Sequence, residues 1–258
     1  MLEVLRGIFI PFLGTVLGAA TVFIFRKGMS SRVQRAFSGF AAGVMVAASV
    51  WSLIIPSIEQ SASLGGLAFI PVTLGIWVGF FFLMLLDKII PHLHANDMSE
   101  GPKNNLSRST KMILAVALHN LPEGMAVGVA LASLASGENL ISSAATLALS
   151  IGIAIQNFPE GAIISVPLYD EGMSKKKAFI FGALSGIVEP IGAVITLIIA
   201  SSVATLLPYF LSFAAGAMLY VVVEELIPEM TGEGHSHTGT VVFFLGFSLM
   251  LVLDIILK

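Results

Sequence analysis

The sequence predicts an all-α membrane protein with eight transmembrane helices. Of its 258 residues, 56% are hydrophobic and only 11% are charged, and the mean hydropathy is +0.95. Ordinary soluble domains carry about 25% charged residues. Apolar runs long enough to cross a hydrocarbon core of roughly 30 Å recur along the chain. Small residues recur within these runs, as in residues 38–43 and 214–217, and allow helices to pack closely in lipid.

The expected spans follow one another without a soluble domain between them. They cover residues 5–25, 37–58, 69–90, 111–135, 142–167, 178–202, 205–228 and 240–257. The first run precedes Arg26 and Lys27, a charge pattern typical of a retained helix rather than of a cleaved signal peptide. We expect residues 1–258 to form a single transmembrane domain.

The basic residues predict the orientation of the chain in a cell membrane. Eleven of the thirteen Lys and Arg residues lie in or beside the first, third and fifth loops, which leaves Arg6 and Lys258 for the other side. The positive-inside rule then places the odd-numbered loops in the cytoplasm and both termini outside. The seventh loop should also be cytoplasmic, although it carries neither Lys nor Arg.

Two polar loops carry histidines. The third loop, about 91–110, is expected to be mobile. Short histidine clusters suggest transient capture of metal, and the alternative is a solvated loop that binds nothing in particular. The residues concerned are His92, His94, Asn96, Asp97 and Glu100 in the third loop, and Glu233, His235 and His237 in the seventh.

The absence of cysteine limits the metal chemistry. With no cysteine in the chain there is neither a disulfide nor a thiolate ligand. A bound metal must therefore be held by imidazole, carboxylate, amide or thioether groups. Such ligands favour Zn²⁺ and its first-row neighbours over Cu(I) or iron–sulfur clusters.

Two six-residue stretches repeat inside the fourth and fifth spans. Residues 119–124 read His-Asn-Leu-Pro-Glu-Gly and residues 156–161 read Gln-Asn-Phe-Pro-Glu-Gly. Each places an imidazole or amide at position i and a carboxylate at i+4, on one face of a helix. The proline in each removes a helical hydrogen bond, which should free the carbonyls of Leu118 and Ile155. Such groups persist in lipid where they face a cavity, an ion or each other.

Three intramembrane carboxylates need a positive partner. Glu123, Glu160 and Glu189 lie in the fourth, fifth and sixth spans, and no Lys or Arg lies in the middle of these spans. Each charge at the bilayer centre costs about 2.5–3.5 kcal/mol. Protons or divalent cations remain as countercharge, and cation binding to deprotonated ligands would couple to pH. Coincidental packing of hydrogen-bonded polar residues is the alternative.

These residues carry a family resemblance. Residues 119–124 resemble the metal-binding signature of the fourth helix in the ZIP (ZRT/IRT-like) family of divalent-metal transporters. Residues 156–161 resemble its fifth-helix partner in the bacterial GufA-like branch, and Glu189-Pro190 is similar to that branch's sixth-helix acid. The resemblance covers essentially the whole chain. It implies a 3+2+3 inverted-repeat arrangement, sliding of spans 1, 4, 5 and 6 against spans 2, 3, 7 and 8, and a homodimer.

The same resemblance implies a two-metal site at mid-membrane. It assigns the first metal to His119, Glu123, Gln156 and Glu160, and the second to Asn120, Asn157 and Glu189, with Glu123 and Glu160 bridging. Met45 matches a second-helix methionine that contributes a thioether in this branch, and its other interpretation is a core methionine. The two amides of the fifth span make the site less acidic than family versions with Asp or His there.

Further acids at the ends of spans resemble the family's entrance and exit residues by position. Their alternative interpretation is as ordinary interfacial charges. Glu59 and Asp254 should lie near the outer mouth, and Asp87, Glu224 and Glu225 near the cytoplasmic mouth.

The expected function is import of divalent metal, Zn²⁺ first, into the cytoplasm by alternating access. Cd²⁺, Fe²⁺ and Mn²⁺ also suit these ligands. The alternative is a proton- or sodium-coupled carrier of a small solute that uses the glutamates as proton sites. An intramembrane metalloenzyme is disfavoured because the chain has no HExxH motif and no obvious nucleophile, so no enzyme activity is expected. Metal ions, the lipid bilayer and a second copy of the chain are the expected partners, and nucleic acid is not.

Overall fold

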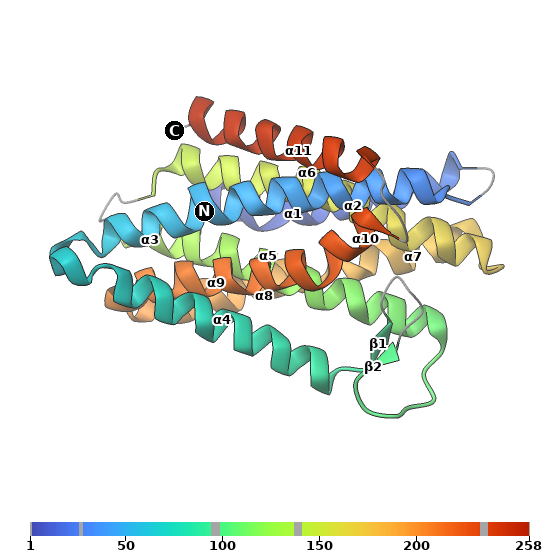
Figure 1. Cartoon of the computed structure of the whole chain (residues 1–258), viewed down its shortest axis with the longest axis horizontal. Coiled ribbons are helices and arrows are strands. Elements are labelled where there is room, and N and C mark those ends of the chain that lie inside the picture. The colour runs from blue at the N-terminus through green and yellow to red at the C-terminus, as the bar shows by residue number, and fades with distance from the viewer. Residues whose placement is uncertain (1, 26–27, 94–98, 137–140, 233–236, 258) are drawn as a thin grey trace.

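In the computed structural model the chain forms a bundle of long helices, which confirms the expected all-α membrane fold (Figure 1). The structure describes residues 2–25, 28–93, 99–136, 141–232 and 237–257. Within this part, eight helical segments are long and apolar enough to cross a membrane: Leu2–Phe23, Ser31–Gln60, Phe69–Ile89, Arg108–Ala135, Ser143–Asp170, Lys175–Ser202, Leu207–Thr231 and His237–Ile256. The second span begins at Ser31 rather than at residue 37.

Several spans consist of more than one helical element. In chain order the elements are α1 (Leu2–Ala20), η1 (Thr21–Phe23), α2 (Ser31–Ala47), η2 (Ala48–Ile54), α3 (Ile55–Gln60), η3 (Ala62–Leu67), α4 (Phe69–Ile89), β1 (His92–Leu93), β2 (Ser99–Glu100), α5 (Arg108–Ala135), α6 (Ser143–Asp170), α7 (Lys175–Ser185), α8 (Val188–Ser202), η4 (Ala204–Leu206), α9 (Leu207–Val221), η5 (Val222–Leu226), α10 (Ile227–Thr231) and α11 (His237–Ile256). The short strands β1 and β2 pair antiparallel within the third loop, a feature that the sequence analysis did not predict.

Serine caps define where three of the helices begin. The side chains of Ser30, Ser107 and Ser142 accept hydrogen bonds from backbone N–H groups three residues later, at the starts of α2, α5 and α6. A helix leaves its first N–H groups without intrahelical partners, and a serine oxygen satisfies one of them. The helices α5 and α6 then continue through the prolines of the two repeated stretches.

The second and seventh spans share a local irregularity. Each contains a π-helical turn, η2 or η5, followed by a helix with a proline in its first turn, Pro56 or Pro228. A proline removes an N–H and prevents the regular hydrogen bond one turn earlier. Such wide turns occur often at functional sites, and η5 contains Glu224 and Glu225.

Four helix pairs pack through glycines: α1 with α6, α5 with α8, α2 with α11, and α4 with α9. Gly14, Gly128, Gly43 and Gly79 each lie so close to a backbone carbonyl of the partner helix that a Cβ would collide with it. Close backbone approach of this kind is how helices associate in lipid. These contacts fix the depth and rotation of each helix.

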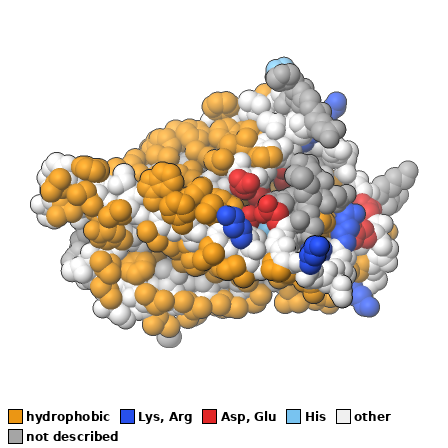
Figure 2. Space-filling model, turned by 60° about the horizontal axis from the view of Figure 1, so that its bottom comes forward, with side chains coloured by type: hydrophobic (Ala, Val, Ile, Leu, Met, Phe, Trp, Pro, Cys, Tyr) orange, Lys and Arg blue, Asp and Glu red, His pale blue; other side chains and the backbone are white. Residues whose placement is uncertain are grey.

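The surface and the interior follow the membrane setting. Figure 2 shows hydrophobic side chains over most of one face, with charged side chains gathered toward one end. Inside, the main apolar cluster includes Val127 and Leu131 of the C-terminal half of α5 and Leu149 and Ile153 of the N-terminal half of α6. This half of the bundle, opposite the third loop, is therefore filled by packed side chains.

Candidate functional site

The two repeated stretches and the third glutamate meet inside the bundle, on α5, α6 and α8. Six of these side chains are no more than 6% exposed: Asn120, Glu123, Gln156, Asn157, Glu160 and Glu189. Gly124 brings α5 against α8, since a Cβ there would collide with the carbonyl oxygen of Glu189. Among the described residues, no Lys or Arg forms an ion pair with any of the three glutamates.

The two repeated stretches interlock through their side chains. Gln156 Nε2 donates to Glu123 Oε1 at 2.6 Å, so the first residue of the second stretch bonds the carboxylate of the first. This bond orients the amide, because only its NH₂ group can donate. Gln156 Oε1 and Glu123 Oε2 are buried and have no hydrogen-bond partner among the described residues.

Glu189 is held by two donors on a single oxygen. Asn120 Nδ2 donates to Glu189 Oε1 at 2.9 Å, and Thr15 Oγ1 of α1 donates to the same atom at 2.6 Å. Glu189 Oε2 and Asn120 Oδ1 are buried without a hydrogen-bond partner in the described part of the chain. The sequence analysis did not identify Thr15, whose only signal was a hydroxyl in an otherwise apolar stretch.

Glu160 and Asn157 extend this set of free ligand atoms. Both carboxylate oxygens of Glu160 and both amide atoms of Asn157 are buried and make no hydrogen bond to a described residue. An unsatisfied buried polar group costs about 1–3 kcal/mol, and more if it is charged. A concentration of free carboxylate and amide oxygens is the kind of environment that a divalent cation or ordered water satisfies.

His119 faces a different partner from the one its motif suggests. His119 Nε2 lies 3.0 Å from Glu225 Oε1, and the two side chains are 12% and 11% exposed. The helical spacing had predicted His119 beside Glu123 on one face of α5. Glu225 had been assigned to the cytoplasmic mouth because of its place near the end of the seventh span. The π-helical turn η5 brings Glu225 to the edge of the polar cluster.

A cavity of about 220 Å³ connects this cluster to the end of the bundle that carries the third loop. His119, Glu160 and Glu225 line its inner part, and Leu93 and Arg108 line the part near that loop. On the opposite side of the cluster lies the packed apolar core, which includes the fully buried Met45. Of the cluster, His119 and Glu160 are the residues that line the cavity and face the third-loop end.

A further acid in this cavity was missed by the sequence analysis. Glu229 of α10 lines the cavity and accepts a hydrogen bond of 2.8 Å from Gln34 Nε2 of α2. Its position four residues after Glu225, one helical turn away, was the available signal.

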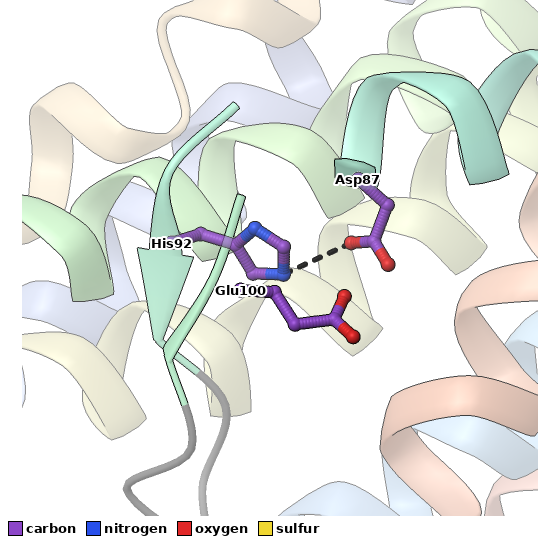
Figure 3. Close-up of side chains that lie close together, drawn as sticks. All are labelled: Asp87, His92 and Glu100. Atoms are coloured by element: carbon purple, nitrogen blue, oxygen red, sulfur yellow. Dashed lines mark ion pairs between the residues drawn. The ribbon is translucent and has the colours of Figure 1, made fainter. Parts of the chain in front are cut away.

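The third loop brings a second group of ligand types together near the same end. His92 is buried, with Nδ1 2.8 Å from the carbonyl oxygen of Ile90 and Nε2 2.9 Å from Asp87 Oδ1 (Figure 3). Tyr220 donates to Asp87 Oδ2 at 2.8 Å. One ligand atom each from Asp87, His92 and Glu100 lies within 4.8 Å of the others. The sequence analysis named these residues separately, and the hairpin of β1 and β2 unites them.

The remaining acids at span ends differ in exposure. Asp254 is buried on α11 and accepts a hydrogen bond of 3.0 Å from Ser52, whereas Glu59 and Glu224 are exposed. His237 begins α11. The other loop residues named from the sequence, His94, Asn96, Asp97, Glu233 and His235, lie outside the described residues.

The fold and the site together define a polytopic α-helical membrane protein with a ligand-rich polar cluster buried between its spans. The family profile described as ZIP zinc transporter matches residues 107–254. The chain therefore belongs to the ZIP family.

Relatives extend the similarity over nearly the whole chain. It is 39% identical over 247 residues to zinc transporter ZIPB of Bordetella bronchiseptica, covering 94% of this chain and 77% of that protein. It is 35% identical over 244 residues to zinc transporter GufA of Myxococcus xanthus, covering 93% of each. It is 33% identical over 332 aligned positions to human zinc transporter ZIP11, covering 98% of this chain and 96% of the relative.

Proposed function

We propose that this protein is a transporter that carries divalent metal ions, Zn²⁺ first, into the cytoplasm. The observation that carries the proposal is the convergence of three buried glutamates with unpartnered amide oxygens from α5 and α6, without Lys or Arg among their described partners. Three carboxylates bring a charge of −3 and two divalent ions bring +4, so metal supplies the countercharge that the protein does not. Membership of the ZIP family and relatives named as zinc transporters support the choice of substrate.

Two metal positions share the cluster in this proposal. His119, Glu123, Gln156 and Glu160 hold the first ion, and Asn120, Asn157 and Glu189 hold the second, with Glu123 and Glu160 between them. The unpartnered oxygens of Gln156, Asn120 and Glu189 support this division. Met45, by its match to the family's second-helix methionine, adds a thioether ligand to the site. Cd²⁺, Fe²⁺ and Mn²⁺ are further possible substrates of such nitrogen and oxygen ligands.

Transport proceeds by alternating access. Spans 1–3 and 6–8 form an inverted repeat around spans 4 and 5, a plan that places substrate sites near the bilayer midplane. Span 1 (α1) packs against span 5 (α6), and span 6 (α8) packs against span 4 (α5) in the same way. The π-helical turns η2 and η5 occur in the corresponding spans 2 and 7. Both correspondences support this 3+2+3 arrangement. Spans 1, 4, 5 and 6 slide as a unit against the others.

The chain is in the state open to the cytoplasm. The cavity leads toward the loops richest in Lys and Arg, which the positive-inside rule assigns to the cytoplasm. Both termini then lie outside a cell membrane. Glu225, Glu229 and the Asp87–His92–Glu100 group lie along the exit, while Glu59 and Asp254 serve the entrance. One domain comprises the whole chain, and two copies form a homodimer.

Uptake of ⁶⁵Zn into liposomes that contain the purified protein tests the proposal. We expect wild type and Glu3→Ala to transport zinc, because Glu3 is exposed and accepts a hydrogen bond from Ser143 at the surface, away from the cluster. We expect Glu123→Ala to lose uptake. Normal uptake by Glu123→Ala would refute the assignment of the transport site to this cluster. A wild-type protein that moves protons or sodium with a solute, but no metal, would refute the function.

A further inference from the structure

We propose that Thr15, on the first span, is a positioning residue for the second metal position. Its hydroxyl fixes the carboxylate of Glu189 so that Oε2 points toward the ligand cluster. This inference rests on the proposed function and deepens it, since it adds a helix, α1, that contributes no metal ligand of its own.

The hydrogen-bond pattern around Glu189 carries the argument. Thr15 Oγ1 and Asn120 Nδ2 both donate to Oε1, at 2.6 and 2.9 Å, while Oε2 has no hydrogen-bond partner among the described residues. A carboxylate has two equivalent oxygens and a rotatable terminal bond, so one hydrogen bond leaves its orientation loosely defined. Two donors on one oxygen, from different helices, leave the other oxygen directed away from both.

Thr15 is itself held from two sides. It is fully buried, and its backbone carbonyl lies against Gly161, where a Cβ would collide with it. Its Cβ and Cγ2 lie against Gly186, just before α8. A β-branched side chain is also stiff about χ1 in a helix. The hydroxyl therefore has little freedom, and a rigid donor is what orients a ligand.

This arrangement resembles the outer partners that orient ligands at metal sites in general. Loss of such partners typically costs 10- to 100-fold in metal affinity. The same hydroxyl also affects the amide of Asn120, because both donors share one acceptor. Without the Thr15 hydroxyl, Glu189 Oε1 is held by Asn120 alone. The carboxylate and the bonded Asn120 amide can then rotate together, so that Asn120 Oδ1 is less firmly directed toward the second metal position.

The test compares hydroxyl-bearing and hydroxyl-free variants of the purified full-length protein. Thr15→Ser and Thr15→Ala lack the same methyl group, so their difference reports the hydroxyl rather than packing. Thr15→Val keeps the shape and removes only the donor. Thr196→Val is a matched control, because Thr196 is a buried threonine on α8, 4% exposed, that packs near Gly128.

Two readouts separate positioning from general stability. Calorimetric titration with Zn²⁺ should show two binding events in wild type, Thr15→Ser and Thr196→Val. In Thr15→Ala and Thr15→Val one event should weaken about 10- to 100-fold. Anomalous scattering from Cd²⁺-soaked crystals should then show reduced occupancy beside Asn120 and Glu189, and full occupancy beside His119.

Three outcomes would overturn the inference. The first is equal binding by Thr15→Ser and Thr15→Ala, and the second is equal weakening of both metal positions. The third is a Thr15→Val protein that folds and binds both ions as wild type does. A wild type that binds no Zn²⁺ at the cluster would instead refute the proposed function, so the two failures are distinguishable.

Discussion

His119 Nε2 and Glu225 Oε1 lie 3.0 Å apart and join α5 to the π-helical turn of the seventh span. An ionised carboxylate only accepts hydrogen bonds, so this contact engages a proton on Nε2. A protonated ring nitrogen cannot bind metal. The pair therefore competes with metal for Nε2 of His119, and it lines the inner part of the cavity.

Replacement of Glu225 should separate binding from release. Glu225→Ala removes the competitor for His119, and we expect Zn²⁺ affinity to rise about fivefold, which corresponds to roughly 1 kcal/mol for a partly exposed ion pair. Uptake should slow, because the proposed exit loses a carboxylate. Calorimetry and ⁶⁵Zn uptake measure the two effects. The neighbouring Glu224→Ala, at an exposed position, serves as control, and unchanged affinity in Glu225→Ala would contradict the competition.

Gln156→Glu should make the protein more dependent on metal. The change replaces the amide donor to Glu123 with a fourth carboxylate, and a hydrogen bond to a charged group is worth about 1.5–3 kcal/mol. Without metal, we expect the melting temperature to fall by several degrees. Saturating Zn²⁺ should restore most of the loss. Gln60→Glu, which changes the partner of Ser133 at the other end of the bundle, should show no such rescue.

Removal of metal should lower the stability of the wild type itself. A ligand present at 100 times its Kd stabilises the folded state by about 2.7 kcal/mol. We therefore expect EDTA to lower the melting temperature of protein purified with Zn²⁺. Glu123→Ala should show little change between Zn²⁺ and EDTA, because it lacks the carboxylate that we propose is shared by the two metal positions. Equal shifts in both proteins would place the stabilising metal elsewhere.

Gly124→Ala should damage the cluster through the backbone. A Cβ at this position would collide with the carbonyl oxygen of Glu189, so α8 must move away from α5. Overpacking of this kind typically costs about 1–3 kcal/mol. The melting temperature and the affinity for zinc should both decrease. Gly66→Ala is the matched control, because open space surrounds Gly66 and its substitution should leave both quantities unchanged.

Asp254→Asn tests the proposed entrance. Asp254 is buried on α11 and bonded by Ser52, so its charge acts with less screening by water than that of the exposed Glu59. We expect Asp254→Asn to raise the KM for external zinc severalfold and Glu59→Gln to change it less. Initial rates of uptake over a range of zinc concentrations measure this. A larger effect at Glu59 would reverse the assignment.

The sequence alone determined the class of fold, and it predicted the main types of metal ligand. Eight apolar runs predict eight spans because lipid offers no hydrogen bonds to an exposed backbone. Carboxylates in the middle of such spans indicate function because their burial is costly. The spacing of His119 and Glu123, and of Gln156 and Glu160, follows from local helical periodicity, so no tertiary information was needed to see it.

Only the tertiary structure decided which side chains meet. The bonds from Gln156 to Glu123 and from Thr15 to Glu189 join positions far apart in the sequence. The rotation and depth of each helix determine such contacts, and close glycine packing between helix pairs fixes both. The hairpin of β1 and β2 brings Glu100 beside Asp87 and His92, an arrangement within one loop that helical periodicity does not record. A one-dimensional pattern records the period of a helix but not the direction in which its neighbours face.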